Sequence, residues 1–142
     1  QMFFSLSFIT YILSFFSQLI ASDLLIKIPN IENNSGSLHI ALYDNSNNFP
    51  KHDGKKLGIK KNINEVLLDG GIVLKDLTSG VYAIAIYHDE NDNGKFDKLF
   101  SFPLEKYGFS NDAPVFFGPP SFKKASFELK KNENFTIFIN LR

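Results

Sequence analysis

The hydrophobic and polar positions of this chain alternate with a period of two in several separate stretches, which is the pattern of a half-buried strand. The stretches that predict strands are residues 24–28, 38–42, 71–77, 81–87, 125–129 and 135–141. Residues 81–87 are apolar at nearly every position, as expected of a central strand that is covered on both faces. No long stretch shows a helical period. The chain is therefore predicted to be all-β, an antiparallel β-sandwich of about seven strands.

Short polar segments separate several of these predicted strands. They are residues 33–36, 79–80 and 131–134, which are rich in Asn, Ser, Gly and Lys. Short links of this composition favour antiparallel neighbours in one sheet, so each is expected to join a pair of adjacent strands. Two longer connections remain, residues 45–70 and 88–124. We expect the first to cross between the sheets, with a helical turn near residues 64–68.

The first 22 residues carry no charge, and the small residues Ala21 and Ser22 follow the apolar stretch. This pattern predicts a secretory signal peptide over residues 1–22 and one domain over residues 23–142. An uncleaved anchor is the alternative, because about 18 apolar residues can begin to span a bilayer. We therefore expect an exported protein, periplasmic or secreted, with no membrane span after signal cleavage.

The composition of the chain excludes several classes of function. Lysine plus arginine number 15 and aspartate plus glutamate number 15, so no basic excess exists to bind nucleic acid. The chain has no cysteine, which excludes thiol catalysis and cysteine zinc sites. No nucleophile elbow or phosphate-binding loop is present, and no organic cofactor is expected. The sequence names no partner; an envelope protein or a glycan are the candidates.

One segment has the spacing of an EF-hand-type calcium loop. The pattern D-x-N-x-N-G-x-x-D occupies residues 89–97, directly after the predicted central strand. Calcium takes six to eight oxygen ligands, and the glycine permits the sharp turn that brings them together. The candidate metal ligands are the side chains of Asp89, Asn91, Asn93 and Asp97 and the backbone carbonyl of Lys95.

This match is incomplete. The twelfth position of the loop is Phe100, where an EF-hand carries a bidentate glutamate, so Asp92 or Glu105 would have to complete the shell. A plain polar turn is the alternative, because Asn93–Gly94 favours a tight hairpin turn and Asp and Asn side chains stabilise turns without metal. The sequence leaves both interpretations open.

Four further residues are candidates for ligand binding: His88, Glu105, Tyr107 and Phe109. His88 could act as a base oriented by Asp89 or Glu105, which makes a hydrolase the alternative function. The competing interpretation is a histidine that is hydrogen-bonded at the end of its strand. Tyr107 and Phe109 belong to an aromatic-rich connection and form either an exposed platform for a ligand or a lid over the end of the sandwich.

Three stretches together resemble a known bacterial family. They are residues 36–50, with G-x-L-x-I-A-L-Y and a later F-P; residues 77–97, with L-x-x-G-x-Y before the acidic loop; and residues 103–111, P-x-E-x-Y-G-F-S-N. The combination resembles the exported family called domain of unknown function 2141. Ser101–Phe102 departs from it, because a glycine is expected before the proline motif.

The resemblance implies a prealbumin-like (transthyretin-like) Greek-key sandwich and no established activity. Transthyretin-related hydrolases share that topology, but their C-terminal Tyr-Arg-Gly-Ser signature is absent from this chain. The leading expectation is thus a non-enzymatic exported module, binding or envelope-associated, with an acidic loop that calcium orders.

Overall fold

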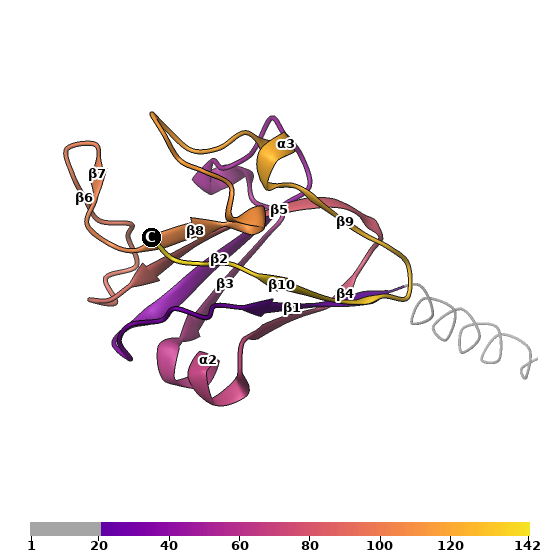
Figure 1. The fold of residues 1–142 in the computed structure, drawn as a ribbon, viewed down its shortest axis with the longest axis horizontal. Coiled ribbons are helices and arrows are strands. Elements are labelled where there is room, and N and C mark those ends of the chain that lie inside the picture. Colours follow the sequence, from indigo (N-terminus) through magenta and orange to yellow (C-terminus); the bar gives the residue numbers. More distant parts are fainter. Residues whose placement is uncertain (1–20) are drawn as a thin grey trace, which may run out of the picture.

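The computed structural model describes residues 21–142, and strands dominate them (Figure 1). The first sheet has the order β10-β1-β4, formed by β10 (Asn134–Phe138), β1 (Ser22–Lys27) and β4 (Ile72–Leu77). The second has the order β3-β2-β5-β8, formed by β3 (Leu57–Asn62), β2 (Ser37–Tyr43), β5 (Gly80–Asp89) and β8 (Tyr107–Phe109), with β9 (Phe127–Leu129) also paired to β5. β6 (Lys98–Leu99) and β7 (Phe102–Pro103) make a separate ribbon.

The helical segments are η1 (His52–Gly54), α2 (Ile63–Asp69), η2 (Ser110–Asp112) and α3 (Phe122–Ala125). The prediction of an all-β sandwich is confirmed.

The main core lies between the two sheets. Alternate residues of each strand face inward, so that Leu24 and Ile26 of β1 and Ile84 and Ile86 of β5 belong to one buried cluster. Their burial removes apolar side chains from water, which is the main favourable contribution to folding.

A second, smaller core covers the outer face of β5. Ala83 is fully buried there against a cluster that includes Tyr43, Phe49 and Phe109. Phe49 and Phe109 pack edge to face, with their ring centroids 5.9 Å apart. Because this cluster lies on the side of β5 opposite the main core, the prediction that the central strand is covered on both faces is confirmed.

The prediction that the short links join adjacent strands is wrong. The links β1 to β2, β4 to β5 and β9 to β10 all pass from one sheet to the other. A short turn reverses the chain direction, but it does not decide whether the next strand stays in the same sheet. In the first sheet β1 pairs antiparallel with β4 and parallel with β10.

The connection over residues 45–70 holds the predicted helical turn, and it also holds β3, which the sequence pattern missed. β3 is the edge strand of the second sheet, and Ile59 is half-buried while its flanking residues are exposed, so the alternation is weak. α2 begins after Asn62, whose side chain accepts a hydrogen bond from the Asn64 N–H at 2.9 Å. It ends at Gly70, which adopts the left-handed conformation typical of helix C-termini.

The predicted signal peptide lies outside the described residues except for its last two positions. β1 begins at Ser22, whose hydroxyl donates to the Lys130 carbonyl at 2.6 Å and accepts from the Glu133 N–H at 3.1 Å. Ser22 is therefore part of the folded domain. Within residues 21–142 no helix has the length and apolar character needed to cross a membrane.

Candidate metal site at the end of strand β5

The acidic loop starts where β5 ends, and β2 supports it from one side. Ser37 pairs with Asp89 in the register of β2 and β5. The preceding Gly36 has a φ of 69°, and a Cβ at this position would lie 1.9 Å from the Asp89 carbonyl oxygen. The backbone segments at residues 36 and 89 therefore approach so closely at the start of the loop that position 36 requires glycine.

Asp89 closes the loop with its buried side chain. Its side chain is inaccessible to solvent. Oδ1 accepts a hydrogen bond from the Asn93 N–H at 3.1 Å, and Oδ2 accepts from the Gly94 N–H at 2.8 Å. Oδ2 also accepts from Nε2 of His39 at 3.0 Å. A carboxylate offers about four lone pairs, so these three bonds leave one acceptor position, on Oδ1.

The side chains of Asn91 and Asn93 converge on Asp97. The Asn91 amide donates to Asp97 Oδ2 at 2.8 Å, and the Asn93 amide donates to both carboxylate oxygens at 3.1 and 2.8 Å. The hydrogen bond from Asn91 and then that from Asn93 lower the pKa of Asp97. The amide oxygens of the two asparagines accept from the N–H groups of Asn93 and Lys95. Three of the predicted ligands thus meet, in an arrangement that also suits a polar turn.

Glu105 reaches the same place from the far end of the β6–β7 ribbon. Its side chain is only 7% exposed, and Oε2 accepts from the Asp97 N–H at 3.1 Å. Oε1 has no hydrogen-bond partner, and it is the one buried side-chain polar atom in residues 21–142 of which this is true. Burial raises the pKa of Glu105, and the charges of Asp89 and Asp97 raise it further, against the hydrogen bond from the Asp97 N–H and a smaller effect of the Glu90 N–H, which does not reach hydrogen-bond geometry with Oε1.

Tyr87 lies close enough to feel the charges of these carboxylates. Burial raises the pKa of the Tyr87 phenol to about 12, and the charges of Asp89, Glu105 and Asp97 contribute in that order. Each negative charge nearby disfavours the phenolate, so the three carboxylates add to the effect of burial.

Asp92 faces away from this centre. Its Oδ1 lies 2.8 Å from Nζ of Lys60 and 2.9 Å from the Ser37 hydroxyl. These two hydrogen bonds, the one from Lys60 first, lower the pKa of Asp92. Of the two residues predicted to complete a calcium shell, Glu105 is therefore near the loop's interior, whereas Asp92 is held by β2 and β3.

The structure does not bring His88 and Asp89 together. Successive residues of a strand face opposite sides of the sheet, and His88 is buried on the inner side, where its Nε2 lies 2.6 Å from the Ser35 carbonyl oxygen. Asp89 instead bonds to His39 of β2, which also stacks on Tyr87 with centroids 4.6 Å apart. This partnership of His39 could not be predicted from the sequence, because it depends on the register between two strands.

Tyr107 and Phe109 form β8, which pairs with β5 opposite Tyr87 and Ala85. Phe109 is buried in the second core, and the half-buried Tyr107 packs against Phe96 with centroids 5.8 Å apart. Both rings therefore pack on the outer face of β5, as part of the second sheet rather than over the end of the sandwich.

Residues 21–142 contain no group of three or more His, Cys, Asp or Glu side chains placed to hold a metal ion. A cation at this loop would therefore need the amide and carbonyl oxygens as well as the carboxylates. The donor set contains only oxygen, which suits a hard cation such as calcium.

Fold and site define an all-β sandwich domain that carries an acidic loop at the end of its central strand. The chain belongs to the bacterial family described as "Uncharacterized protein conserved in bacteria (DUF2141)", whose sequence profile matches residues 26–137. Membership of this family, predicted from the three motifs, is confirmed. No curated protein and no solved structure matches the chain, and the likeness to prealbumin stays a prediction.

Proposed function

We propose that this protein is an exported, non-enzymatic binding module whose loop over residues 89–97 binds calcium and is ordered by it. One observation carries the calcium proposal: Oε1 of Glu105 is buried without a partner, beside Asp89 and Asp97. An unsatisfied buried carboxylate is costly, and a neighbouring like charge adds to the cost. A divalent cation bound among the three carboxylates would remove both penalties.

Glu105 and Asp97 would supply the principal charges, and Asp89 would add the acceptor position left on its Oδ1. The amide oxygens of Asn91 and Asn93 and the carbonyl of Lys95 would complete an oxygen shell, after rotation of the two amides that now donate to Asp97. Calcium accepts such irregular shells of six to eight oxygens. Calcium loops of extracellular modules bind with dissociation constants of about 10⁻⁴ to 10⁻³ M, which fits a stabilising role.

Binding at this place would fix the base of the β6–β7 ribbon. Asp97 and Glu105 stand at its two ends, and the Leu104 N–H donates to the Asp97 carbonyl at 2.9 Å. An ion held by both carboxylates would therefore join the two ends of the ribbon. The export part of the proposal is supported by the uncharged residues 1–22.

Terbium luminescence tests the calcium proposal directly. Terbium replaces calcium at oxygen sites, and a nearby tyrosine excites it; the chain has no tryptophan to interfere. We expect Tyr87 to sensitise bound terbium, calcium to displace it, and Tyr87→Phe to remove most of the emission. Tyr43→Phe, in the second core, is the matched control and should leave the emission unchanged.

Thermal unfolding with calcium provides the second measurement. Calcium at about 10 mM should raise the melting temperature of the wild type, whereas magnesium at equal ionic strength should not. Glu105→Gln should abolish the calcium effect, and Glu128→Gln, which removes an exposed charge on β9, should keep it. A wild type whose melting temperature and terbium emission do not respond to calcium would show that the loop is only a polar turn.

A further inference from the structure

Two loops of this domain end in large apolar side chains that the fold leaves in solvent. The β6–β7 ribbon exposes Leu99, Phe100, Phe102 and Leu104, and the connection before α3 exposes Phe116 and Phe117. Phe100 is 92% exposed, and Phe117 is fully exposed. Single apolar residues on a surface are ordinary, but six on two connections of one chain mark an interaction surface.

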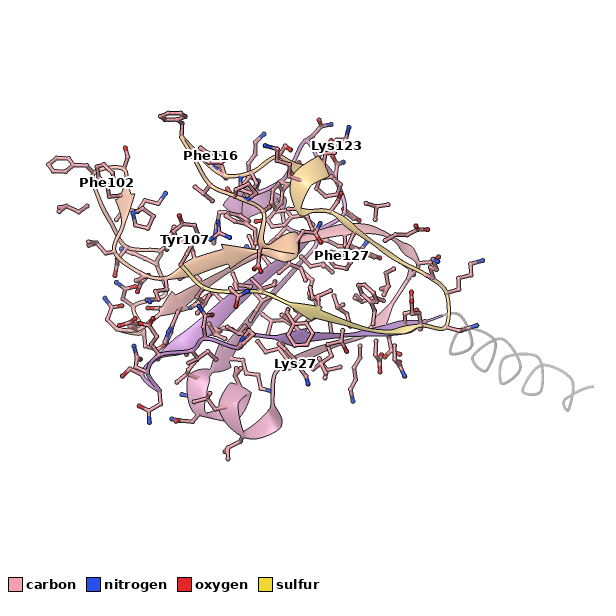
Figure 2. The ribbon with its side chains drawn as sticks, viewed as in Figure 1. Lys27, Phe102, Tyr107, Phe116, Lys123 and Phe127 are labelled. Carbon is pink, nitrogen blue, oxygen red and sulfur yellow. The ribbon has the colours of Figure 1, made fainter. Side chains whose placement is uncertain are left out.

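The two tips project from the same side of the domain. In Figure 1 the β6–β7 ribbon and the connection that leads to α3 both leave the sandwich on the side away from α2. Figure 2 shows the rings of Phe102 and Phe116 directed outward from the body rather than folded onto it. Both rings could therefore meet one surface placed against that side.

The turn of the β6–β7 ribbon contains a backbone conformation that does not stabilise the domain. Phe100 has a φ of 56°, in the left-handed region that costs free energy for a bulky residue. Glycine or asparagine would fit that conformation better, and the exposed ring of Phe100 gains no packing in return. Within the described residues, no packing of the Phe100 ring offsets the free-energy cost of this backbone conformation. A contact with another molecule would offset it.

The ribbon also suits an apolar environment because its backbone is paired. Lys98 pairs with Pro103 and Leu99 with Phe102. Backbone N–H and C=O groups that enter a low-dielectric region must already be satisfied, and a paired hairpin brings few free ones to the interface.

Lysines surround both tips. Lys95 and Lys98 flank the start of the ribbon, and Lys123 and Lys124 follow the second tip on α3. All four are exposed, and none takes part in the ion pairs found within residues 21–142. Lys98 lies over the ring of Phe96, with Nζ 5.3 Å from the ring centroid.

We propose that these two tips insert into the interfacial region of an anionic lipid bilayer, with the four lysines at the level of the headgroups. Aromatic rings favour that region, and each lysine near an anionic surface adds to the attraction. A fluid bilayer accepts two separate projecting tips, whereas a protein partner would need a matched hollow for each. This inference goes beyond the calcium proposal; Asp97 and Glu105 at the base of the ribbon bring negative charge toward the same surface, which the lysines at the tips must outweigh.

The absence of cysteine makes a site-by-site test possible in the full chain. Phe102→Cys, Phe117→Cys and Leu68→Cys would each carry one polarity-sensitive fluorophore. Leu68 is 87% exposed on α2, at the opposite side of the domain, and is the matched control. Because each label reports on its own position, the comparison holds whatever else in the chain contacts lipid.

Vesicles of phosphatidylcholine and phosphatidylglycerol at a ratio of about 7 to 3 should shift the emission of labels 102 and 117 to the blue. Nitroxide lipids should quench these two labels and leave label 68 unchanged. Replacing Lys123→Glu together with Lys124→Glu should weaken the response about tenfold or more, whereas Lys130→Glu with Lys131→Glu, beyond β9, should change it less.

Three results would overturn the proposal. The first is no shift at labels 102 and 117 with anionic vesicles, and the second is an equal shift at label 68. The third is a shift at labels 102 and 117 that grows with protein concentration without vesicles, which would assign the tips to contact between copies of this chain. The circular dichroism spectrum of each labelled variant must match the wild type, so that a negative result refers to folded protein.

Discussion

Glu105→Gln should have opposite effects on stability with and without calcium. The substitution keeps the size of the side chain and an oxygen to accept from the Asp97 N–H, but it removes a buried charge beside Asp89 and Asp97. A buried acceptor without a partner costs about 1 to 3 kcal/mol, and a charged one costs more. Without calcium at neutral pH, we therefore expect the variant to be about 1 kcal/mol more stable than the wild type, a rise in melting temperature of roughly 4 °C for a domain of this size.

Calcium should reverse that order. With a dissociation constant of about 0.3 mM, calcium at about 10 mM stabilises the wild type by about 2 kcal/mol. The variant loses a charged ligand and should gain little. Urea unfolding of both proteins, with a chelator and with calcium, measures the four free energies. A variant that is less stable than the wild type in chelator and still responds fully to calcium would refute the reasoning.

The pH dependence gives the same prediction a second check. The pKa of Glu105 is raised in the folded protein above its usual 4.5, so the folded state holds the proton more tightly than the unfolded state. The stability from this group is fully present below pH 4.5 and is lost as pH rises through the raised pKa. In chelator, the advantage of Glu105→Gln should therefore grow as pH rises from acid to neutral. A constant difference between the proteins across that range would show that Glu105 is not perturbed.

Three other substitutions test the surroundings of the site. Gly36→Ala should destabilise the domain by about 2 kcal/mol or more in urea unfolding, because its Cβ would meet the Asp89 carbonyl, whereas Gly118→Ala, which meets nothing within 4 Å, should change little. Phe109→Ala should cost about 3 to 5 kcal/mol in the same assay by emptying the second core, and a loss under 1 kcal/mol would mean that β8 is not packed there. Lys60→Gln should move the pKa of Asp92 back toward 3.8, as followed by NMR titration, and an unchanged pKa would contradict the contact.

The strand pattern of the sequence predicted most of the fold, because burial on one face of a strand repeats every second residue. It failed at β3, where no residue is fully buried and Ile59 is the one apolar residue that is even half-buried. It also failed for the short links, because the sheet that a strand joins is decided by distant partners. β4 follows β3 and α2 in the chain, yet it pairs with β1.

The local part of the site was visible in the sequence, and the distant part was not. The spacing of Asp89, Asn93 and Gly94 determines which groups can meet across a tight loop, and these residues do bond to one another. His39 enters from β2, and no spacing within the loop could reveal it. Glu105 and Asp92 were the two residues predicted to complete a calcium shell. The contacts of Asp92 with β2 and β3 turn its side chain away and leave Glu105.

The aromatic residues of the long connection show the same limit. Phe100 and Phe109 are nine residues apart in one aromatic-rich segment, but one is exposed and the other is buried. The difference comes from the pairing of β8 with β5, which places Phe109 opposite Ala85 in the sheet and its ring in the second core. Composition alone could not separate a residue that completes a core from one that is left for an external contact.

The parallel pairing of β1 with β10 has a consequence for the order of assembly. Asp23 lies opposite Asn134, so the first described strand gains its second neighbour only when the last one has been made. Until then its edge stays open, and the closing contact joins residues that lie far apart in the sequence, which slows folding. The first sheet of the domain is therefore completed only after β10 has been synthesised, although β1 can already pair with β4.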